Sequence, residues 1–319
     1  MHPTARPKGV QGPAEAGAGR DEPVRLRAGC KINYGLAITG RRPDGYHLLD
    51  SVFIPLPEPC DELLVWRIPE PAIRVACAAE GVDEEDNTLV RAWRKFREAT
   101  GLAIGLAVEL KKGVPWGAGL GGGSADAACL LRHLQRLAEG RVDEGRLLAI
   151  AARVGADVPF FLQDAPMRVT GIGDVLEPVA LDLPGRDLVL VTPKIAVSTP
   201  WAYQTWDRLC GVRPDARDAR AGGSEKPLTK SGTEDKQSSL LGSRGFTARN
   251  DLELAVFPSY PEIAEVKDRL LSLGAAAASM SGSGSSVFGL FQDSAGAERA
   301  CEALSAVWPV RRMRICTGM

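Results

Sequence analysis

The stretch most able to do chemistry covers residues 115–128 and holds five glycines within the seven residues 117–123. Glycine has no Cβ, so its backbone can adopt positive φ angles and expose its N–H groups. A helical apolar pattern follows directly, with Ser124 as the expected N-cap and Gly140 as the expected stop. Free amides and the positive dipole end at a helix N-terminus attract phosphate oxygens. The stretch therefore predicts a loop that binds nucleotide phosphates.

Two common phosphate loops fit this stretch poorly. Gly117, Gly119 and Gly122 have the spacing of the dinucleotide-binding fingerprint, but residues 111–115 separate them from the expected strand 106–110. Asp143, at about the right distance for the acidic partner, heads another helix. No Gly-Lys-Ser/Thr follows, which excludes a Walker A loop. A glycine-rich connection without a ligand is disfavoured because ordering five glycines costs entropy.

The loop resembles the phosphate loop of the GHMP kinases, Pro-x-x-x-Gly-Leu-Gly-Ser-Ser-Ala, with Gly122 and Gly123 filling the space before Ser124. Three other segments resemble that family. The first is Cys30-Lys31-Ile32-Asn33 followed by residues 40–47, where Cys30 replaces the usual alanine. The others are the Gly-Ala-Asp-Val-Pro-Phe run at residues 155–160 and the Ser/Gly run at residues 281–286. The likeness covers nearly all of residues 24–319 except residues 211–245.

The resemblance implies a kinase that transfers the γ-phosphoryl group of ATP to an alcohol. Asp157 would accept the proton of the substrate hydroxyl, and Lys31 would be the lysine near that hydroxyl. Mg²⁺ would offset the phosphate charge, and no metal-ligating side chain is assigned. The implied ATP contacts are Asn87, Lys112, Pro115, Trp116, Gly117, Ala118, Gly119, Leu120, Gly121, Gly122, Gly123, Ser124 and Ala125.

The triple glycine and Asp44-Gly45-Tyr46-His47 are similar to one branch of the family. That branch phosphorylates the 2-hydroxyl of a cytidine diphosphate-linked methylerythritol in the non-mevalonate isoprenoid route. Tyr46 would stack on the cytosine and His47 would hydrogen-bond its edge, which suits a flat heterocycle. The further implied substrate contacts are Asn33, Tyr203, Gly282, Ser283 and Gly284.

Each of these residues also has an ordinary structural interpretation. A lysine beside an apolar strand is usually an edge residue whose amino group reaches water. Asn87 fits a helix N-cap, and Asp157 fits a turn just past a helix end. Tyr46 and His47 fit a turn, Lys112 fits a solvated strand end, and Tyr203 fits core packing. A Ser/Gly run is often a linker, although the one at residues 281–286 directly precedes an apolar strand.

Composition limits the class of protein. The chain has 319 residues, of which 45% are hydrophobic and 25% charged, and predicts a soluble protein of two domains. A net charge of −1 gives no electrostatic case for nucleic acid. Seven scattered cysteines without a Cys-x-x-Cys pair predict a reduced, cytoplasmic chain without a structural metal. No apolar run predicts a membrane span. A monomer or weak homodimer is expected.

The order of the expected elements indicates an α+β chain. The GHMP resemblance implies an N-terminal domain like domain 2 of ribosomal protein S5 over residues 24–184, and a ferredoxin-like domain over residues 185–319. Residues 1–23 have no apolar signal region and are interpreted as a disordered tail. Residues 211–245 are interpreted as a low-complexity surface insertion.

Three rival functions stay open at this point. Another GHMP kinase, of the homoserine or mevalonate type, would have no pyrimidine to stack on Tyr46. A dinucleotide-binding oxidoreductase would need the glycines to follow their strand directly. A non-catalytic nucleotide-binding module would not need both Lys31 and Asp157.

Overall fold

The computed structural model describes residues 22–78, 87–181, 183, 185–211, 241–242 and 245–315. Nearly all of the expected tail at residues 1–23 and most of the expected insertion at residues 211–245 lie outside these ranges. The chain forms two compact units, each built from separate stretches of sequence. The first unit takes residues 1–28, 60–113 and 123–158, and the second takes residues 29–59, 114–122 and 159–319.

Two long strands supply residues to both units. They are β1 (Val24–Arg41) and β2 (His47–Arg67), which pair with each other. The sequence predicted shorter strands, at residues 24–28, 32–38 and 49–56. Three prolines stand at alternate positions of β2, namely Pro55, Pro57 and Pro59. Alternate residues direct their backbone groups to one edge, so these prolines remove donors from that edge alone and the strand can continue.

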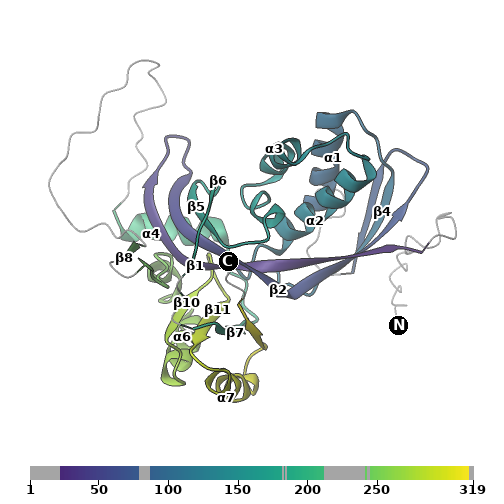
Figure 1. The fold of residues 1–319 in the computed structure, drawn as a ribbon. Helices are drawn as coiled ribbons and strands as arrows, with labels where there is room; N and C mark the ends of the chain where they lie inside the picture. Colours follow the sequence, from purple (N-terminus) through teal and green to yellow (C-terminus); the bar gives the residue numbers. More distant parts are fainter. Residues whose placement is uncertain are drawn as a thin grey trace, which may run out of the picture. The chain divides into compact units, whose positions relative to one another are not determined.

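The first unit combines strands with three helices (Figure 1). In it β4 (Leu106–Lys111) pairs antiparallel with the end of β2 and parallel with β3 (Ile73–Cys77), a strand that the sequence did not predict. The helices are α1 (Thr88–Thr100), α2 (Gly122–Leu137) and α3 (Glu144–Val154), and α1 packs against α3.

The ends of these helices follow their predicted signals, with one exception. Asn87 and Asp143 cap α1 and α3, and Gly101 and Gly155 follow their last residues. The prediction that Ser124 is an N-cap is wrong, because α2 begins two residues earlier at Gly122. Gly121 has a φ of 73°, which ends the loop before Ser124 is reached.

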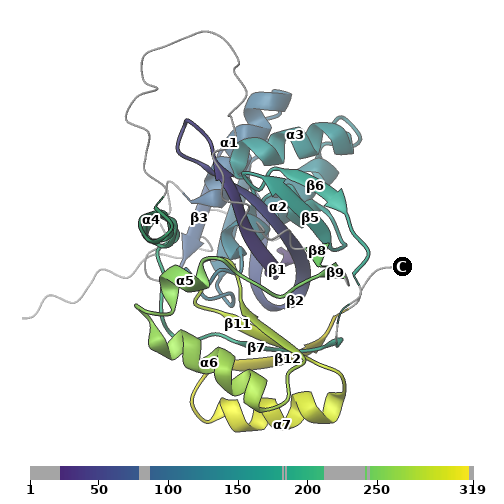
Figure 2. The same ribbon diagram turned by 90° about the vertical axis from the view of Figure 1, so that its left-hand side faces the viewer.

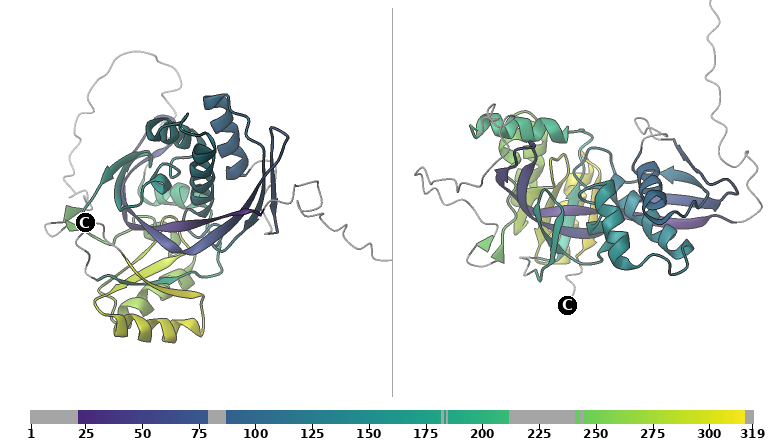
Figure 3. Two further views of the ribbon diagram at one scale, coloured as in Figure 1. Left: turned by 45° about the vertical axis from the view of Figure 1, so that its right-hand side comes forward. Right: turned by 90° about the horizontal axis from the view of Figure 1, so that it is seen from above.

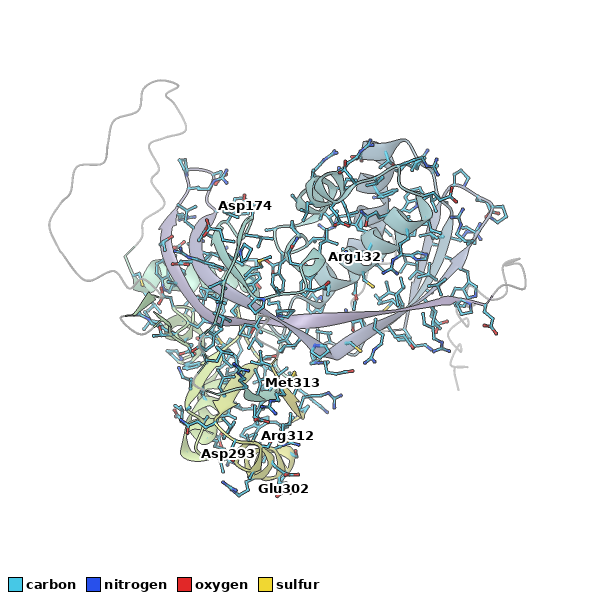
Figure 4. The ribbon with its side chains drawn as sticks, in the orientation of Figure 1. Arg132, Asp174, Asp293, Glu302, Arg312 and Met313 are labelled. Atoms are coloured by element: carbon cyan, nitrogen blue, oxygen red, sulfur yellow. The ribbon has the colours of Figure 1, made fainter. Side chains whose placement is uncertain are left out.

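The second unit contains a hairpin of β5 (Met167–Gly171) and β6 (Val175–Pro178), joined by the turn sequence Gly171-Ile172-Gly173-Asp174, and β5 also pairs with β2. Asp174, labelled in Figure 4, lies in the hairpin turn and accepts a hydrogen bond from the Ile172 amide at 3.0 Å. A short 3-10 helix, η2 (Phe160–Leu162), precedes the hairpin, and Phe160 packs edge-on against Phe53 of β2.

A four-stranded antiparallel sheet completes the second unit. Its strand order is β10 (Ala277–Met280), β11 (Val287–Phe291), β7 (Asp187–Val191) and β12 (Val310–Arg314). The helices α6 (Pro261–Ser272) and α7 (Ser294–Ser305) lie together on one face of this sheet (Figures 2 and 3). Asp293, labelled in Figure 4, caps α7 through the Gly296 amide.

The alternation of apolar residues in β7 explains how this sheet is buried on both faces. Val189 and Val191 pack with residues of α6 and α7, whereas Leu188 and Leu190 pack with residues of β1 and β2. Successive side chains of a strand point to opposite faces, so the apolar run Leu188–Val191 of β7 requires apolar partners on both faces.

The remaining elements of the second unit are short. They are α4 (Thr199–Leu209), α5 (Glu253–Val256), β8 (Leu241–Gly242) and β9 (Gly245–Phe246). Ser198 caps α4, and Pro200 stands in its first turn as predicted. No helix in the described part of the chain is long and apolar enough to cross a membrane.

Candidate active site

The glycine loop, from Pro115 to the start of α2, is a tight backbone turn in the second unit. Gly117, Gly119 and Gly121 have φ angles of 65°, 74° and 73°, a region that side chains with a Cβ rarely adopt. A Cβ at Gly119 would lie 2.0 Å from the Ser281 carbonyl oxygen, and one at Gly121 would lie 3.0 Å from the Phe161 ring. The glycines are therefore required by the backbone conformation and by close neighbours.

The Ser/Gly run at residues 281–286 packs directly against this loop. The Ser281 hydroxyl donates to the Gly119 carbonyl at 3.0 Å, and the Ser286 amide donates to the Ala118 carbonyl at 3.1 Å. The Asn250 side-chain amide donates to the carbonyls of Met280 and Gly282, and these two hydrogen bonds hold the run in place. The run is thus an ordered second loop, and the linker interpretation is wrong.

Lys31 is buried beneath the glycine loop, with 4% of its surface exposed, so it is not an edge lysine in water. Its amino group donates to the Gly119 carbonyl at 3.0 Å and to the Asn33 side-chain oxygen, and lies 4.7 Å from the centre of the Phe53 ring. The Lys31 amide donates to the Leu120 carbonyl at 2.9 Å. The lysine is thereby fixed against the backbone of the loop.

Asn33 links the same strand to the second loop. Its backbone amide donates to the Ser281 hydroxyl at 3.1 Å, while its side-chain amide donates to the Ser51 hydroxyl at 3.0 Å. A Cβ at Gly282 would lie 3.2 Å from the Asn33 side-chain oxygen. Lys31, Asn33, Gly119 and Gly282 therefore form one cluster in the second unit.

The other predicted residues of the two loops lie at the edges of this cluster. Trp116 is 75% exposed, and Gly117 faces Ala196, where a Cβ on the glycine would lie 3.5 Å from the alanine side chain. Ser283 shares a hydrogen bond of 2.7 Å with Thr199, at the start of α4. Gly284 has a φ of 83°. Pro115 precedes the turn, and Ala118 and Leu120 are buried.

A cavity of about 360 Å³ in the same unit is lined by residues predicted to bind a base. Tyr46 is 61% exposed at its rim. The His47 ring stacks on Tyr203, with 4.7 Å between ring centres and 26° between planes. The cavity is lined by Arg41, Gly45, Tyr46, His47, Leu49, Ile172, Thr199, Pro200, Tyr203, Gln204 and Asp207.

In the first unit, Asn87 acts as the cap of α1, and its side-chain oxygen accepts from the Val90 amide at 3.0 Å. Gly123 lies near Thr88 of the same helix, where a Cβ would be 3.4 Å from the Thr88 hydroxyl. Ser124 and Ala125 lie in the first turn of α2. The start of α1 and the start of α2 are therefore neighbours.

Lys112 belongs to a buried ionic group that the sequence did not predict. Its amino group pairs with Asp61 and with Asp126, the latter at 3.0 Å. Asp61 also accepts from the Gly113 amide at 2.7 Å. Both carboxylates are almost fully buried, so Lys112 is not a solvated strand end.

The burial of this group and the closeness of its charges shift the pKa values of Asp126 and Lys112. Burial, together with the nearby Asp61 carboxylate, raises the pKa of Asp126 to about 7 against the opposing effect of Lys112. The second Asp126 oxygen is buried without a hydrogen-bond partner in the described part of the chain, which adds to the cost of the charged form. The pKa of Lys112 is raised because the two carboxylates outweigh its burial.

Asp157 lies three residues after the end of α3, as the sequence predicted. It follows Gly155, whose carbonyl accepts from the Val158 amide at 3.1 Å and closes the turn. Within the described residues the Asp157 carboxylate forms no hydrogen bond or ion pair, and it is partly exposed. A carboxylate in that state is available to accept a proton.

No group of three His, Cys, Asp or Glu side chains in the described ranges could hold a metal ion. The start of α2 directly follows the glycine loop. Backbone amides at a helix start bind phosphate oxygens.

Sequence reasoning missed the partners that stand far away along the chain. Asp61 and Asp126 surround Lys112, and Arg41 and Asp207 surround His47. Asp126 carried a usable signal, since an acidic residue on the apolar face of α2 requires a buried partner. No such signal in the sequence marked Asp207, because its role depends on where α4 lies.

Comparison with known proteins decides the family. The model of the GHMP kinases N terminal domain matches residues 87–164, and that of the GHMP kinases C terminal domain matches residues 237–310. A protein of Nitratidesulfovibrio vulgaris (strain DP4) named 4-diphosphocytidyl-2-C-methyl-D-erythritol kinase is 47% identical over 284 residues, 89% of this chain and 96% of the relative. The chain belongs to this family of GHMP kinases.

Further relatives support the assignment of the chain to this family. A protein of the same name from Oleidesulfovibrio alaskensis is 44% identical over 318 residues, again 89% of this chain and 96% of the relative. A crystal structure of 4-(cytidine 5'-diphospho)-2C-methyl-D-erythritol kinase is 35% identical with a TM-score of 0.68, and the match covers 91% of this chain and 98% of that one. The predicted GHMP kinase fold is confirmed, and kinase membership rules out the oxidoreductase alternative.

The raised pKa of Asp126 predicts how the stability of this kinase depends on pH. Between an unfolded pKa of 3.8 and a folded pKa of about 7, the folded state holds a proton that the unfolded state has lost. The stabilising effect of that proton is complete below the unfolded pKa and disappears as pH rises through about 7. Asp126→Asn removes this titration. As pH rises from 4 to 7.5, the free energy of unfolding of the variant therefore increases relative to that of the parent by about 2 to 4 kcal/mol.

Urea unfolding of both proteins at pH 4.5, 6.0 and 7.5 measures this difference. Asparagine keeps the size and polarity of the side chain, so the Lys112 pairing with Asp61 is retained. Parallel stability profiles for the two proteins would show that Asp126 is already ionised in the folded state.

Proposed function

We propose that this kinase transfers the γ-phosphoryl group of ATP to the 2-hydroxyl of 4-diphosphocytidyl-2-C-methyl-D-erythritol, a step of the non-mevalonate isoprenoid route. The observation that carries the proposal is the 47% identity, over 89% of the chain, with a relative that bears the name of this kinase. The aromatic cavity of Tyr46, His47 and Tyr203 supports it, because a flat base fits between such side chains.

The glycine loop is proposed to bind the ATP phosphates. The loop residues 115–123 and the first turn of α2, with Ser124 and Ala125, offer backbone amides to the phosphate oxygens. Asn87 and Lys112 are proposed to contact the rest of the nucleotide. Mg²⁺ bound to ATP would neutralise part of the phosphate charge.

Asp157 is proposed as the general base and Lys31 as the cation that stabilises charge on the reacting oxygens. The Asp157 carboxylate suits proton transfer because it is partly exposed and has no partner among the described residues. The fixed position of Lys31 under the glycine loop suits a group that must not reorganise during the reaction. Asn33, Gly282, Ser283 and Gly284 are proposed to hold the alcohol portion of the substrate.

The base is proposed to bind in the 360 Å³ cavity. Tyr46 and Tyr203 would provide aromatic faces and His47 a directed hydrogen bond. Related proposals concern the whole chain: a cytoplasmic enzyme, monomeric or weakly dimeric, without a nucleic-acid partner. The boundary between an N-terminal domain over residues 24–184 and a C-terminal domain over residues 185–319 also stays a proposal.

A coupled assay of ATP consumption with different alcohols tests the substrate. We expect turnover with the cytidyl diphosphate compound and rates at least a hundredfold lower with homoserine or mevalonate, because neither small alcohol fills the base cavity. Equal kcat/KM for mevalonate would favour the other GHMP kinase alternative.

Replacing the proposed base tests the mechanism. Asp157→Asn keeps the shape of the side chain but cannot accept the hydroxyl proton, so kcat should fall at least a hundredfold. The Kd for ATP, measured by calorimetry, should stay unchanged. The conservative Asp164→Asn, two residues past η2, is the matched control. A variant at position 157 with undiminished kcat would overturn the role of this carboxylate.

Replacing the exposed aromatic residue tests base binding. Tyr46→Ala should raise KM for the cytidyl substrate about tenfold, since stacking on a base is worth about 1–3 kcal/mol. KM for ATP should stay unchanged, while Tyr46→Phe should retain most of the affinity. Equal increases in both KM values would argue against stacking.

A further inference from the structure

The ring of His47 is held by three residues of one helix. Tyr203 stacks on its face, Trp206 meets it at 87° with 6.1 Å between ring centres, and Asp207 accepts from its Nε2 at 2.7 Å. These residues are spaced i, i+3 and i+4, so they lie on the same side of α4. The orientation of the imidazole is therefore set by α4.

The contact with Asp207 also fixes where the imidazole proton lies. An ionised carboxylate can only accept hydrogen bonds, so Nε2 must carry a hydrogen. The Arg41 guanidinium, which only donates, lies 3.3 Å from the other Asp207 oxygen, so that oxygen also faces a donor. A neutral imidazole has a single N–H, which leaves Nδ1 as an acceptor.

We propose that Asp207, supported by Arg41, makes His47 a reader of the cytosine 4-amino group and so selects cytosine over uracil. This inference rests on the proposed function, and it adds the residues that determine base specificity. The 4-amino group of cytosine donates hydrogen bonds, whereas uracil has a carbonyl oxygen there that only accepts. An acceptor at Nδ1 therefore attracts the cytosine 4-amino group and repels the uracil carbonyl oxygen. Asp207 thus acts through His47 as a positioning residue.

The geometry also predicts the effect of replacing Asp207 with a neutral residue of the same shape. In Asp207→Asn, Arg41 holds the amide oxygen because a guanidinium only donates. The amide NH₂ group is then left to face Nε2, which must accept, so the imidazole hydrogen moves to Nδ1. His47 would now present a donor, which suits the uracil carbonyl.

The experiment compares kcat/KM for the cytidyl substrate and its uridyl analogue in the parent and in Asp207→Asn. We expect the parent to prefer the cytidyl compound, and the variant to lose roughly tenfold or more of that preference, as for the loss of a directed hydrogen bond. The KM for ATP should stay unchanged. Arg208→Gln, in which the exposed neighbour on α4 is replaced, is the matched control and should retain the parent ratio.

Two results would overturn the inference: an unchanged base preference in Asp207→Asn, or a parent that uses both substrates equally. A parent without activity on either compound would instead contradict the proposed function. The two failures are therefore distinguishable.

Long-range ¹H–¹⁵N NMR of the imidazole rings gives a readout that does not depend on activity. The chain has three histidines, so a His47→Gln spectrum assigns the signals of His47. In spectra recorded at a pH where the ring is neutral, we expect the hydrogen on Nε2 in the parent and on Nδ1 in Asp207→Asn. Hydrogen on Nδ1 of the neutral ring in the parent would refute the inference.

Discussion

The carbonyl oxygen of Gly119 is the point on which the second unit's site depends. It accepts hydrogen bonds from the Lys31 amino group and from the Ser281 hydroxyl, both at 3.0 Å. Residues from three distant stretches of sequence therefore meet at one backbone atom. A carbonyl that accepts two hydrogen bonds must be presented by a sharp turn, and the positive φ angle of Gly119 provides that turn.

This arrangement explains why the site is built from backbone and small side chains. A Cβ at Gly119 would collide with the Ser281 carbonyl, and one at Gly282 would crowd Asn33. Bulkier residues would separate the two loops and remove the Gly119 carbonyl as an acceptor for the buried Lys31 amino group, which is costly. The close packing that brings the loops together is thus the condition for burying a lysine there.

The sequence allowed good predictions wherever the signal was local. The glycine loop, the caps Asn87, Asp143 and Ser198, and the strand β7 follow from neighbouring residues. The family followed from three motifs in order. Sequence reasoning fell short where the outcome depended on distant residues, as for the start of α2 and the ionic partners. His47 and Asp207 are 160 residues apart, and no periodicity connects them.

The two buried ionic groups show why such partners matter. Around Lys112, Asp126 is almost fully buried beside a second carboxylate, so its pKa rises to about 7 despite the nearby cation. Around Asp207 one carboxylate receives two donors, Arg41 and His47, so it acts as a fixed acceptor. An aspartate side chain therefore retains its own proton at position 126, whereas at position 207 it fixes where the proton of His47 lies. The number of donors around each carboxylate, set by tertiary packing, decides which role it takes.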